Sequence, residues 1–280
     1  MAKVHPTAVV NPAAELADTV EIGPYAVVES DVKIGEGTVL RSHAVVRRYT
    51  TLGTGNLVDS FAVLGGLPQD YKFTPGTVSY LRIGDNNIFR EGVTISRATG
   101  SGNVTAVGSD TYWMAQSHAG HNVTVEDKVI LVNGAVLGGY ARVGYKALLS
   151  THVGVHQFTW IGRMAIGQGN TGTTCHVPPY CMFADGINRV VGLNTVGLRR
   201  AEHISAEDRR QIKEAFRITY RSGLNLRGAL EQMEACGDWG EAAGLFRDFI
   251  REVIGAEGPF ARPLCKFYRR SKGGWRPAGQ

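Results

Sequence analysis

Two of the eight histidines lie only three residues apart, at His118 and His121. An imidazole titrates near neutral pH, which makes histidine the side chain best suited to act as a general base. Gly139 lies eighteen residues after His121, and Gln157, next to His156, lies eighteen residues after Gly139. An accessible glycine N–H can donate a hydrogen bond to an oxyanion. If eighteen residues form one spatial repeat, a base, an oxyanion donor and a polar pair meet at one edge, as acyl transfer requires.

No serine or cysteine stands beside a partner base in the sequence, which favours direct transfer without a covalent enzyme intermediate. A histidine at a turn of a repeat protein can equally be a solvated residue without function. The shared spacing of His121 and Gly139, and the closeness of His118 and His156, favour the catalytic interpretation. This interpretation requires neither a metal ion nor a cofactor.

Apolar residues recur at every sixth position over much of the chain. The first series is Val4, Val10, Leu16, Ile22, Val28, Ile34, Leu40, Val46, Leu52, Val58 and Leu64. The pattern resumes at Ile83, Phe89 and Ile95, and again at Val107, Trp113, Ala119, Val125, Leu131, Leu137, Val143, Leu149, Val155 and Ile161. The strands of a β-sandwich would instead show a period of two, with turns about every 8–12 residues.

A period of six predicts a parallel β-helix. Each sextet holds a short strand and a turn, three sextets close one triangular coil, and the apolar side chains stack inside it. We assign residues 1–200 to this domain. The pattern breaks at 70–82 and 97–106, which predicts loops extruded from a rigid prism, where functional residues tend to lie.

The spacing of apolar residues becomes helical after about residue 204. Ser205 and Asp208 form a predicted capping box, Gly223 ends that helix, and Asn225 caps the next one. The helices are expected at about 205–223, 225–236 and 239–254. We predict a helical domain over 201–280 that covers the open end of the β-helix.

The four cysteines form no CxxC pair, which indicates reduced thiols and a cytoplasmic protein. The first six residues lack the pattern of a signal peptide, and no apolar run is long enough to span a bilayer. The net charge is +5, with a basic end that contains Arg262, Lys266, Arg269, Arg270, Lys272 and Arg276. Such a tail suits nucleic acid, an acidic protein or nucleotide phosphates, and it can also be a plain solvated tail.

Several motifs together resemble the bacterial UDP-N-acetylglucosamine O-acyltransferases that begin lipid A synthesis. The resemblance covers nearly the whole chain. It is carried by Val-His-Pro-Thr-Ala (4–8), Ile-Gly-Glu-Gly-Thr-Val-Leu (34–40), Gln-Asp-Tyr-Lys (69–72), Val-Gly-Ser-Asp (107–110), His-Ala-Gly-His (118–121), Val-His-Gln-Phe (155–158), Val-Pro-Pro-Tyr (177–180), Gly-Leu-Arg-Arg (197–200) and Tyr-Arg-Ser-Gly (220–223). The Gln-Asp-x-Lys loop, the two histidines and Val-His-Gln-Phe in this order are its most specific part.

The resemblance implies a left-handed coil, contrary to the usual right-handed crossover rule. It also implies a homotrimer with active sites between subunits, acyl carrier protein as the acyl donor and a UDP-sugar as the acceptor. It implies no nucleic-acid partner, no integral membrane segment, no metal and no cofactor.

The resemblance further implies roles for individual residues. His121 would remove the proton from the sugar 3-hydroxyl, and the Gly139 N–H would polarise the acyl thioester. Substrate-binding roles fall on Gln69, Asp70, Lys72, His118, His156, Gln157, Asn194 and Arg200. Within this set Asp70 and Lys72 would contact the sugar nucleotide, and Asn194 and Arg200 its uridine and phosphate end.

The chain departs from the family pattern at four positions. It has Asn122 where the family usually has aspartate after the catalytic histidine, and Tyr140 where the family usually has a further histidine. Val196 and Ala201 replace a glutamate and an arginine near the nucleotide end. These changes leave open an acyltransferase with a different nucleotide amino sugar and a non-catalytic binding protein. A γ-type carbonic anhydrase is disfavoured, because the spacing of His118 and His121 differs from that expected of its ligands.

Overall fold

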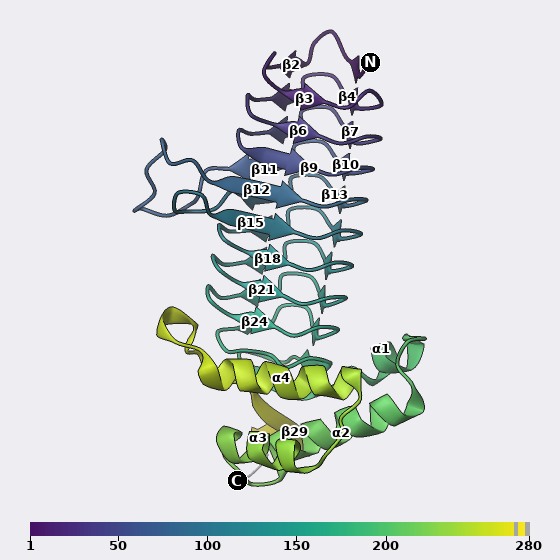
Figure 1. The fold of residues 1–280 in the computed structure, drawn as a ribbon, viewed down its shortest axis with the longest axis vertical. Helices are drawn as coiled ribbons and strands as arrows, with labels where there is room; N and C mark the ends of the chain where they lie inside the picture. Colours follow the sequence, from purple (N-terminus) through teal and green to yellow (C-terminus); the bar gives the residue numbers. More distant parts are fainter. Residues whose placement is uncertain (272–273, 278–280) are drawn as a thin grey trace.

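A computed structural model describes residues 1–271 and 274–277 as a long parallel β-helix with a small helical region at one end (Figure 1). Each full coil contributes one short strand to each of three sheets, and neighbours within a sheet come from successive coils. The predicted parallel β-helix is confirmed.

We name the three sheets A, B and C. Sheet A contains β1 (Lys3–Val4), β4 (Glu21–Ile22), β7 (Val39–Leu40), β10 (Leu57–Val58), β13 (Ile88–Phe89), β16 (Tyr112–Trp113), β19 (Ile130–Leu131), β22 (Leu148–Leu149), β25 (Ile166–Gly167), β27 (Cys181–Phe183), β28 (Arg189–Leu193), β29 (Lys266–Ser271) and β30 (Gly274–Pro277). Sheet B contains β2 (Val9–Val10), β5 (Val27–Val28), β8 (Val45–Val46), β11 (Val63–Gly66), β14 (Thr94–Ser96), β17 (His118–Ala119), β20 (Val136–Leu137), β23 (Gly154–Val155) and β26 (Gly172–Thr173). Sheet C contains β3 (Glu15–Leu16), β6 (Lys33–Ile34), β9 (Thr50–Leu52), β12 (Tyr80–Ile83), β15 (Val104–Val107), β18 (Thr124–Val125), β21 (Arg142–Val143) and β24 (Trp160–Ile161).

The residues of the six-residue period form the core of the prism. From Ile22 to Ile161 every predicted position is at most 4% exposed. The first three positions are less covered, and Val4 is 41% exposed. The first coil has a neighbouring coil on one side only, so its apolar side chains cannot stack on both sides.

Two extended connections interrupt the coils, and the first projects sideways from the prism between β11 and β12 (Figure 1). Both end earlier than the predicted 70–82 and 97–106, because β12 begins at Tyr80 and β15 begins at Val104. These two strands pair with each other in sheet C over four residues. The ends of both predicted loops therefore belong to the rigid sheet.

The corner between sheets B and C has a left-handed backbone. Asn122, Tyr140 and Phe158 occupy it on successive coils with φ of 59°, 60° and 61°. A left-handed residue other than glycine costs about 1–2 kcal/mol. Hydrogen bonds from the Tyr140 N–H to the His121 carbonyl and from the Phe158 N–H to the Gly139 carbonyl hold the corner, at 2.9 and 3.0 Å.

The helices after residue 204 are confirmed as α2 (Ala206–Arg221), α3 (Leu226–Ala235) and α4 (Glu241–Gly255). Ser205 and Asp208 form the predicted capping box, and Asn225 caps α3. The sequence-based prediction missed the short α1 (Thr195–Arg200), the 3₁₀ turn η1 (Gly258–Phe260) and the pairing of β29 with β28.

The basic end is not simply solvated over its described part, because β29 returns to sheet A. Residues 272 and 273 and residues 278–280, with the predicted basic residue Lys272, lie outside the described residues. The division at residue 200 stays a prediction, since β28 and β29 join the two sides. Among the described residues, the longest helices fall short of what crossing a bilayer requires.

Candidate active site

A cavity of about 590 Å³ opens along sheet B beside its corner with sheet C. It collects six predicted site residues from three coils and the first loop: Gln69, His118, His121, Gly139, His156 and Gln157. The eighteen-residue spacing therefore brings the candidate base, the candidate oxyanion donor and the polar pair to one cavity.

The ring of His121 lies directly against Gly139. A Cβ atom at Gly139 would come within 2.8 Å of His121 Nε2 and within 2.7 Å of Cε1, so only glycine leaves room for the ring. Within the described residues, the Gly139 N–H takes part in no hydrogen bond. The base and a free backbone donor are thus neighbours at the cavity wall.

The hydrogen bonds of Asn122 determine which nitrogen of His121 carries the proton. The Asn122 side-chain oxygen lies 2.9 Å from His121 Nδ1 and also accepts from the N–H and hydroxyl of Thr99, at 2.9 and 2.8 Å. The Asn122 amide nitrogen donates to the Thr99 carbonyl at 3.2 Å, which fixes the orientation of the amide. Since the oxygen can only accept, Nδ1 is the donor, so the neutral imidazole has its lone pair on Nε2. Nε2 is the nitrogen that faces Gly139.

An aromatic cluster supports the same corner. Tyr140 meets the His121 ring edge-on at 5.3 Å, and its hydroxyl lies 3.0 Å from the Thr99 hydroxyl. Phe158 stacks on Tyr140 at 4.9 Å, and Phe260 of η1 packs against both rings. The C-terminal region therefore contributes to the rigidity of the candidate base.

The other two histidines of the cavity differ in exposure. His118 Nδ1 lies 2.7 Å from the hydroxyl of Thr94, and burial lowers the pKa of His118 below its ordinary value. His156 is exposed, and its Nδ1–H donates to the carbonyl of Gln157 at 3.1 Å. His118 is accordingly neutral at neutral pH, and its ring can serve as a hydrogen-bonding partner for a substrate.

The cavity wall on sheet B is hollowed by missing side chains. Gly154 and Gly172 occupy successive outward positions, directly above Val136 in the same column. Ile187 closes this end of the cavity and is 66% exposed. An apolar trough without side chains suits an extended acyl chain.

Four predicted substrate-binding residues lie outside this cavity. Asp70 accepts a hydrogen bond from the Lys72 backbone N–H at 2.9 Å, and the Lys72 side chain points into solvent. Asn194 is 8% exposed and caps α1, accepting from the Gly197 N–H and donating to the Met164 carbonyl, both at 2.9 Å. Arg200 is exposed at the end of α1. The fold of one chain therefore brings none of these four to His121.

Among the residues that the sequence-based prediction missed, Gly154 and Gly172 line the cavity, and Thr99 holds Asn122 beside it. The two glycines carry a signal in the sequence, because they replace larger residues at the outward position of a sextet. Thr99 carries no such signal, since it lies in a loop outside the repeat.

Among the described residues of one chain, no three histidine, cysteine, aspartate or glutamate side chains form a metal-binding group. The four cysteines are free thiols. The constellation therefore consists of an oriented imidazole, a backbone donor and an apolar trough, which together can carry out proton transfer and acyl transfer.

The comparisons with known proteins agree on one family. The family model described as "Udp N-acetylglucosamine O-acyltransferase; Domain 2" matches residues 176–275, and a model of six bacterial transferase hexapeptide repeats matches residues 13–48. An acyl-[acyl-carrier-protein]–UDP-N-acetylglucosamine O-acyltransferase of Stenotrophomonas maltophilia is 43% identical over 267 residues, which cover 93% of this chain and 98% of that protein. The chain belongs to the UDP-N-acetylglucosamine O-acyltransferase family.

Further relatives and solved structures of the family support this assignment. A protein of the same name from Anaeromyxobacter is 44% identical over 233 residues, which cover 83% of this chain and 90% of the relative. The UDP-N-acetylglucosamine acyltransferase structure of Francisella novicida has a TM-score of 0.86 at 33% identity, and it covers 96% of this chain and 95% of its own. The Moraxella catarrhalis structure gives the same TM-score and identity. The predicted left-handed β-helix and the predicted family are confirmed.

Proposed function

We propose that the protein transfers a 3-hydroxyacyl or related acyl group from acyl carrier protein to the 3-hydroxyl of UDP-N-acetylglucosamine, the first step of lipid A synthesis. The observation that carries this proposal is the His121 ring, held by Asn122 at Nδ1 with Nε2 against Gly139, at the mouth of an apolar trough. Family membership supplies the class of reaction, and this geometry supplies the residues that perform it.

In the proposed mechanism, Nε2 of His121 accepts the proton of the sugar hydroxyl as its oxygen attacks the thioester carbonyl. The Gly139 N–H donates to the oxyanion that forms. The C–S bond then breaks, and the imidazolium returns the proton to the departing thiolate. General-base catalysis typically contributes about 10²–10⁴-fold to the rate, and one oxyanion donor about 10²–10³-fold.

Asn122 replaces a charged partner by a neutral one. It accepts the Nδ1 proton of His121 in the same way as a carboxylate, so it keeps the required tautomer. It stabilises the imidazolium less, since it carries no negative charge. We infer that Asn122 orients the base, and that Thr99 and Tyr140 fix Asn122 and the ring in turn.

We propose substrate-binding roles for the remaining predicted residues. Gln69, His118, His156 and Gln157 lie at the cavity and would position the sugar and the thioester. Asp70 and Lys72 would contact the sugar nucleotide from the first loop. For the uridine and phosphate end, Arg200 offers an exposed guanidinium, and Asn194 would contribute by fixing the start of α1.

We further propose a homotrimer, and the outward columns of the three sheets support it. Sheet A carries apolar outward residues on successive coils, namely Val39, Leu57, Ile88, Tyr112, Ile130, Leu148 and Ile166. Sheet B begins its column with Val9, Val27, Val45 and Val63. The column of sheet C is mostly polar, with Glu15, Lys33, Thr51, Arg82, Thr124 and Arg142 and only Ala106 and Trp160 as apolar members. A ring of three copies covers two different faces of each subunit and leaves the third in solvent.

The corner between sheets A and B would then face the threefold axis. Tyr25, His43 and Phe61 stack there at 5.1 and 5.0 Å although Tyr25 and Phe61 are 58% and 63% exposed. Phe61→Cys is expected to give disulfide-linked dimers under oxidation, whereas Thr51→Cys on sheet C is expected to give none. Sedimentation at the mass of a monomer with full activity would contradict the trimer.

We place the protein in the cytoplasm, where acyl carrier protein and reduced thiols occur together; the four free cysteines support this location. The acceptor is the part of the proposal that needs the sharpest test, because Tyr140, Val196 and Ala201 depart from the family pattern. Competition between UDP-N-acetylglucosamine and its 3-amino analogue, with one acyl carrier protein thioester, would identify it. A higher kcat/KM for the amino sugar would show that the acceptor is the 3-amino analogue. Absence of turnover with both sugars would favour a binding protein.

A further inference from the structure

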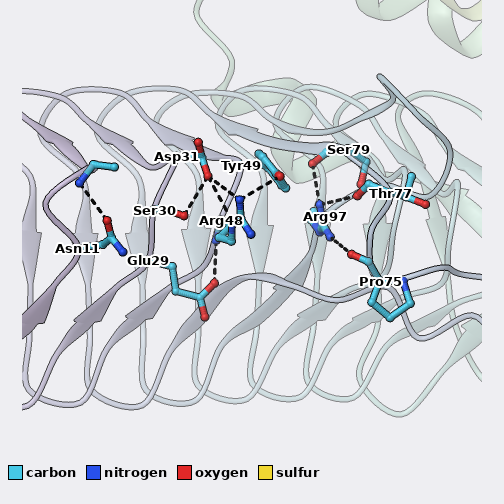
Figure 2. A network of polar contacts seen from close by, with 11 residues as sticks. Asn11, Glu29, Ser30, Asp31, Arg48, Tyr49, Pro75, Thr77, Ser79 and Arg97 are labelled. Carbon is cyan, nitrogen blue, oxygen red and sulfur yellow. Dashed lines mark hydrogen bonds and ion pairs between the residues drawn. The ribbon is translucent and has the colours of Figure 1, made fainter.

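A buried arginine lies where the chain leaves β14 for the second loop. Arg97 is 3% exposed, and its guanidinium donates to three backbone carbonyls of the first loop (Figure 2). The distances are 3.0 Å to Thr77, 3.3 Å to Ser79 and 3.3 Å to Pro75. One side chain therefore holds three points of a loop that lies about twenty residues earlier in the sequence.

Two aromatic rings flank the guanidinium. It lies 5.0 Å from the ring centre of Tyr49 and 5.4 Å from that of Phe73. Among the described residues Arg97 forms no ion pair, and burial lowers its pKa below the ordinary value. Carbonyl oxygens and ring faces thus compensate its charge. A lysine could not reproduce this planar set of donors.

The first loop has few other attachments. The bonds from the Lys72 N–H to the Asp70 side chain, the Phe73 N–H to the Asp70 carbonyl and the Thr77 N–H to the Thr74 carbonyl all stay within the loop. Besides Arg97, the described residues add a bond from the Gly102 N–H to the Val78 carbonyl at 2.9 Å and a bond from the Ser79 hydroxyl to the Ala98 carbonyl at the loop's end. Arg97 is consequently the main side-chain anchor of the loop.

This loop is also the part of the first 80 residues that reaches the cavity. Gln69 lines the cavity, whereas Arg97 does not. Two residues beyond Arg97, Thr99 binds Asn122, which orients His121. The short segment from Arg97 to Thr99 therefore holds the loop with one end and the candidate base with the other.

We propose that Arg97 is a positioning residue for the acceptor, which holds the loop so that Gln69, Asp70 and Lys72 meet the sugar nucleotide. The inference rests on the proposed acceptor-binding role of these three residues. Arg97 touches neither substrate nor base, so its loss should weaken acceptor binding more than it slows the chemical step.

Steady-state kinetics and limited trypsin digestion of Arg97→Lys and Arg97→Met test the proposal. Loss of charge-assisted hydrogen bonds predicts an increase of about tenfold or more in KM for UDP-N-acetylglucosamine, with a smaller change in kcat and in KM for the acyl carrier protein thioester. Trypsin is expected to cleave after Lys72 faster than in the wild type, because Lys72 is exposed on the released loop. Phe73→Leu removes a ring from Arg97 without touching the charge, so it should show the same two effects in weaker form.

Arg48→Met is the matched control. Arg48 lies 5.0 Å from the same Tyr49 ring and pairs with Asp31 at 3.0 Å, but within the described part of the chain it donates to no carbonyl of the first loop (Figure 2). The KM of Arg48→Met for UDP-N-acetylglucosamine and its rate of trypsin cleavage after Lys72 should equal those of the wild type. Unchanged KM and cleavage in the Arg97 variants, or faster cleavage with unchanged KM, would overturn the inference. Absence of wild-type turnover would count against the proposed function, and the digestion would still decide whether Arg97 anchors the loop.

Discussion

Sheet B has two halves with the same coil geometry, and they differ in the side chains that point outward. In the first half the outward column is Val9, Val27, Val45 and Val63, one β-branched side chain per coil. Near the cavity the column continues from Val136 to Gly154 and Gly172. From Val28 to Val155 the inward positions of this sheet stay apolar and buried in both halves.

The difference shows how a repeat fold acquires a site. The inward residues must obey the repeat, because each stacks on the coils before and after it. The outward residues are free of that constraint, so two glycines can open a trough without disturbing the core. Regular outward residues suit contact between subunits, and departures from the pattern suit substrate.

The requirement for apolar inward residues is tested by Leu131→Asp, which has the largest expected effect. Leu131 is fully buried, and an unpaired carboxylate at that position is expected to cost several kcal/mol. Thermal unfolding should show a large fall in Tm or no cooperative transition. Ile130→Asp, one residue away but outward, should leave the fold of the chain intact, and equal Tm values for the two variants would refute the assignment of faces.

The outward half is tested by restoring the regular column with Gly154→Val. No atom lies within 4 Å of a Cβ at Gly154, so the fold should accept valine with an unchanged or raised Tm. The added side chain fills the trough, and overpacking of about 1–3 kcal/mol predicts a 10–100-fold loss of kcat/KM for long acyl thioesters. Short acyl groups should be affected less, and Thr51→Val on sheet C should change neither. A uniform loss for all chain lengths would mean that the trough does not hold the acyl chain.

The role of Asn122 at the corner near the cavity can be tested by Asn122→Asp. The carboxylate would accept the same hydrogen bonds from Thr99 and His121 and would add a negative charge that stabilises the imidazolium. The acidic limb of the kcat/KM profile should therefore move to higher pH, by about one unit for 1.4 kcal/mol of added interaction. An unchanged limb would show that His121 is not the group that titrates.

The smallest effect concerns the end of the β-helix, where His176 joins the coil to the C-terminal region. It is fully buried, accepts from the Trp160 N–H and donates to the Phe260 carbonyl, both at 3.0 Å. Burial lowers the pKa of His176, so the unfolded chain takes up a proton first as the pH falls. The contribution of His176 to the free energy of unfolding should be at its full value above about pH 6.5 and should decrease below that pH. His176→Gln should flatten this decrease in the free energy of unfolding, and the same slope as the wild type would exclude the assignment.

The features of the fold and the site that follow from the six-residue period could be predicted from the sequence. Ile22 to Ile161 could be placed in the core, and His121, Gly139 and Gln157 on one edge, because each coil has a constant length. Thr99 and Phe260 could not be predicted, since a loop and a 3₁₀ turn bring them to the corner from outside the repeat. Asn194 was predicted as a substrate ligand, and its side chain is used to cap α1, a competition that depends on where the helix begins. Asp70, Lys72 and Arg200 stay predictions because one chain does not bring them to the cavity.

Single-turnover acyl transfer by His121→Ala tests the central claim most directly. The variant would be mixed with UDP-N-acetylglucosamine and an acyl carrier protein thioester, and ester formation would be followed by mass spectrometry. We expect a rate lower by about 10²–10⁴-fold than that of the wild type, with the circular dichroism and Tm of the wild type preserved. Ester formation at the wild-type rate by the folded variant would contradict the assignment of His121 as the general base.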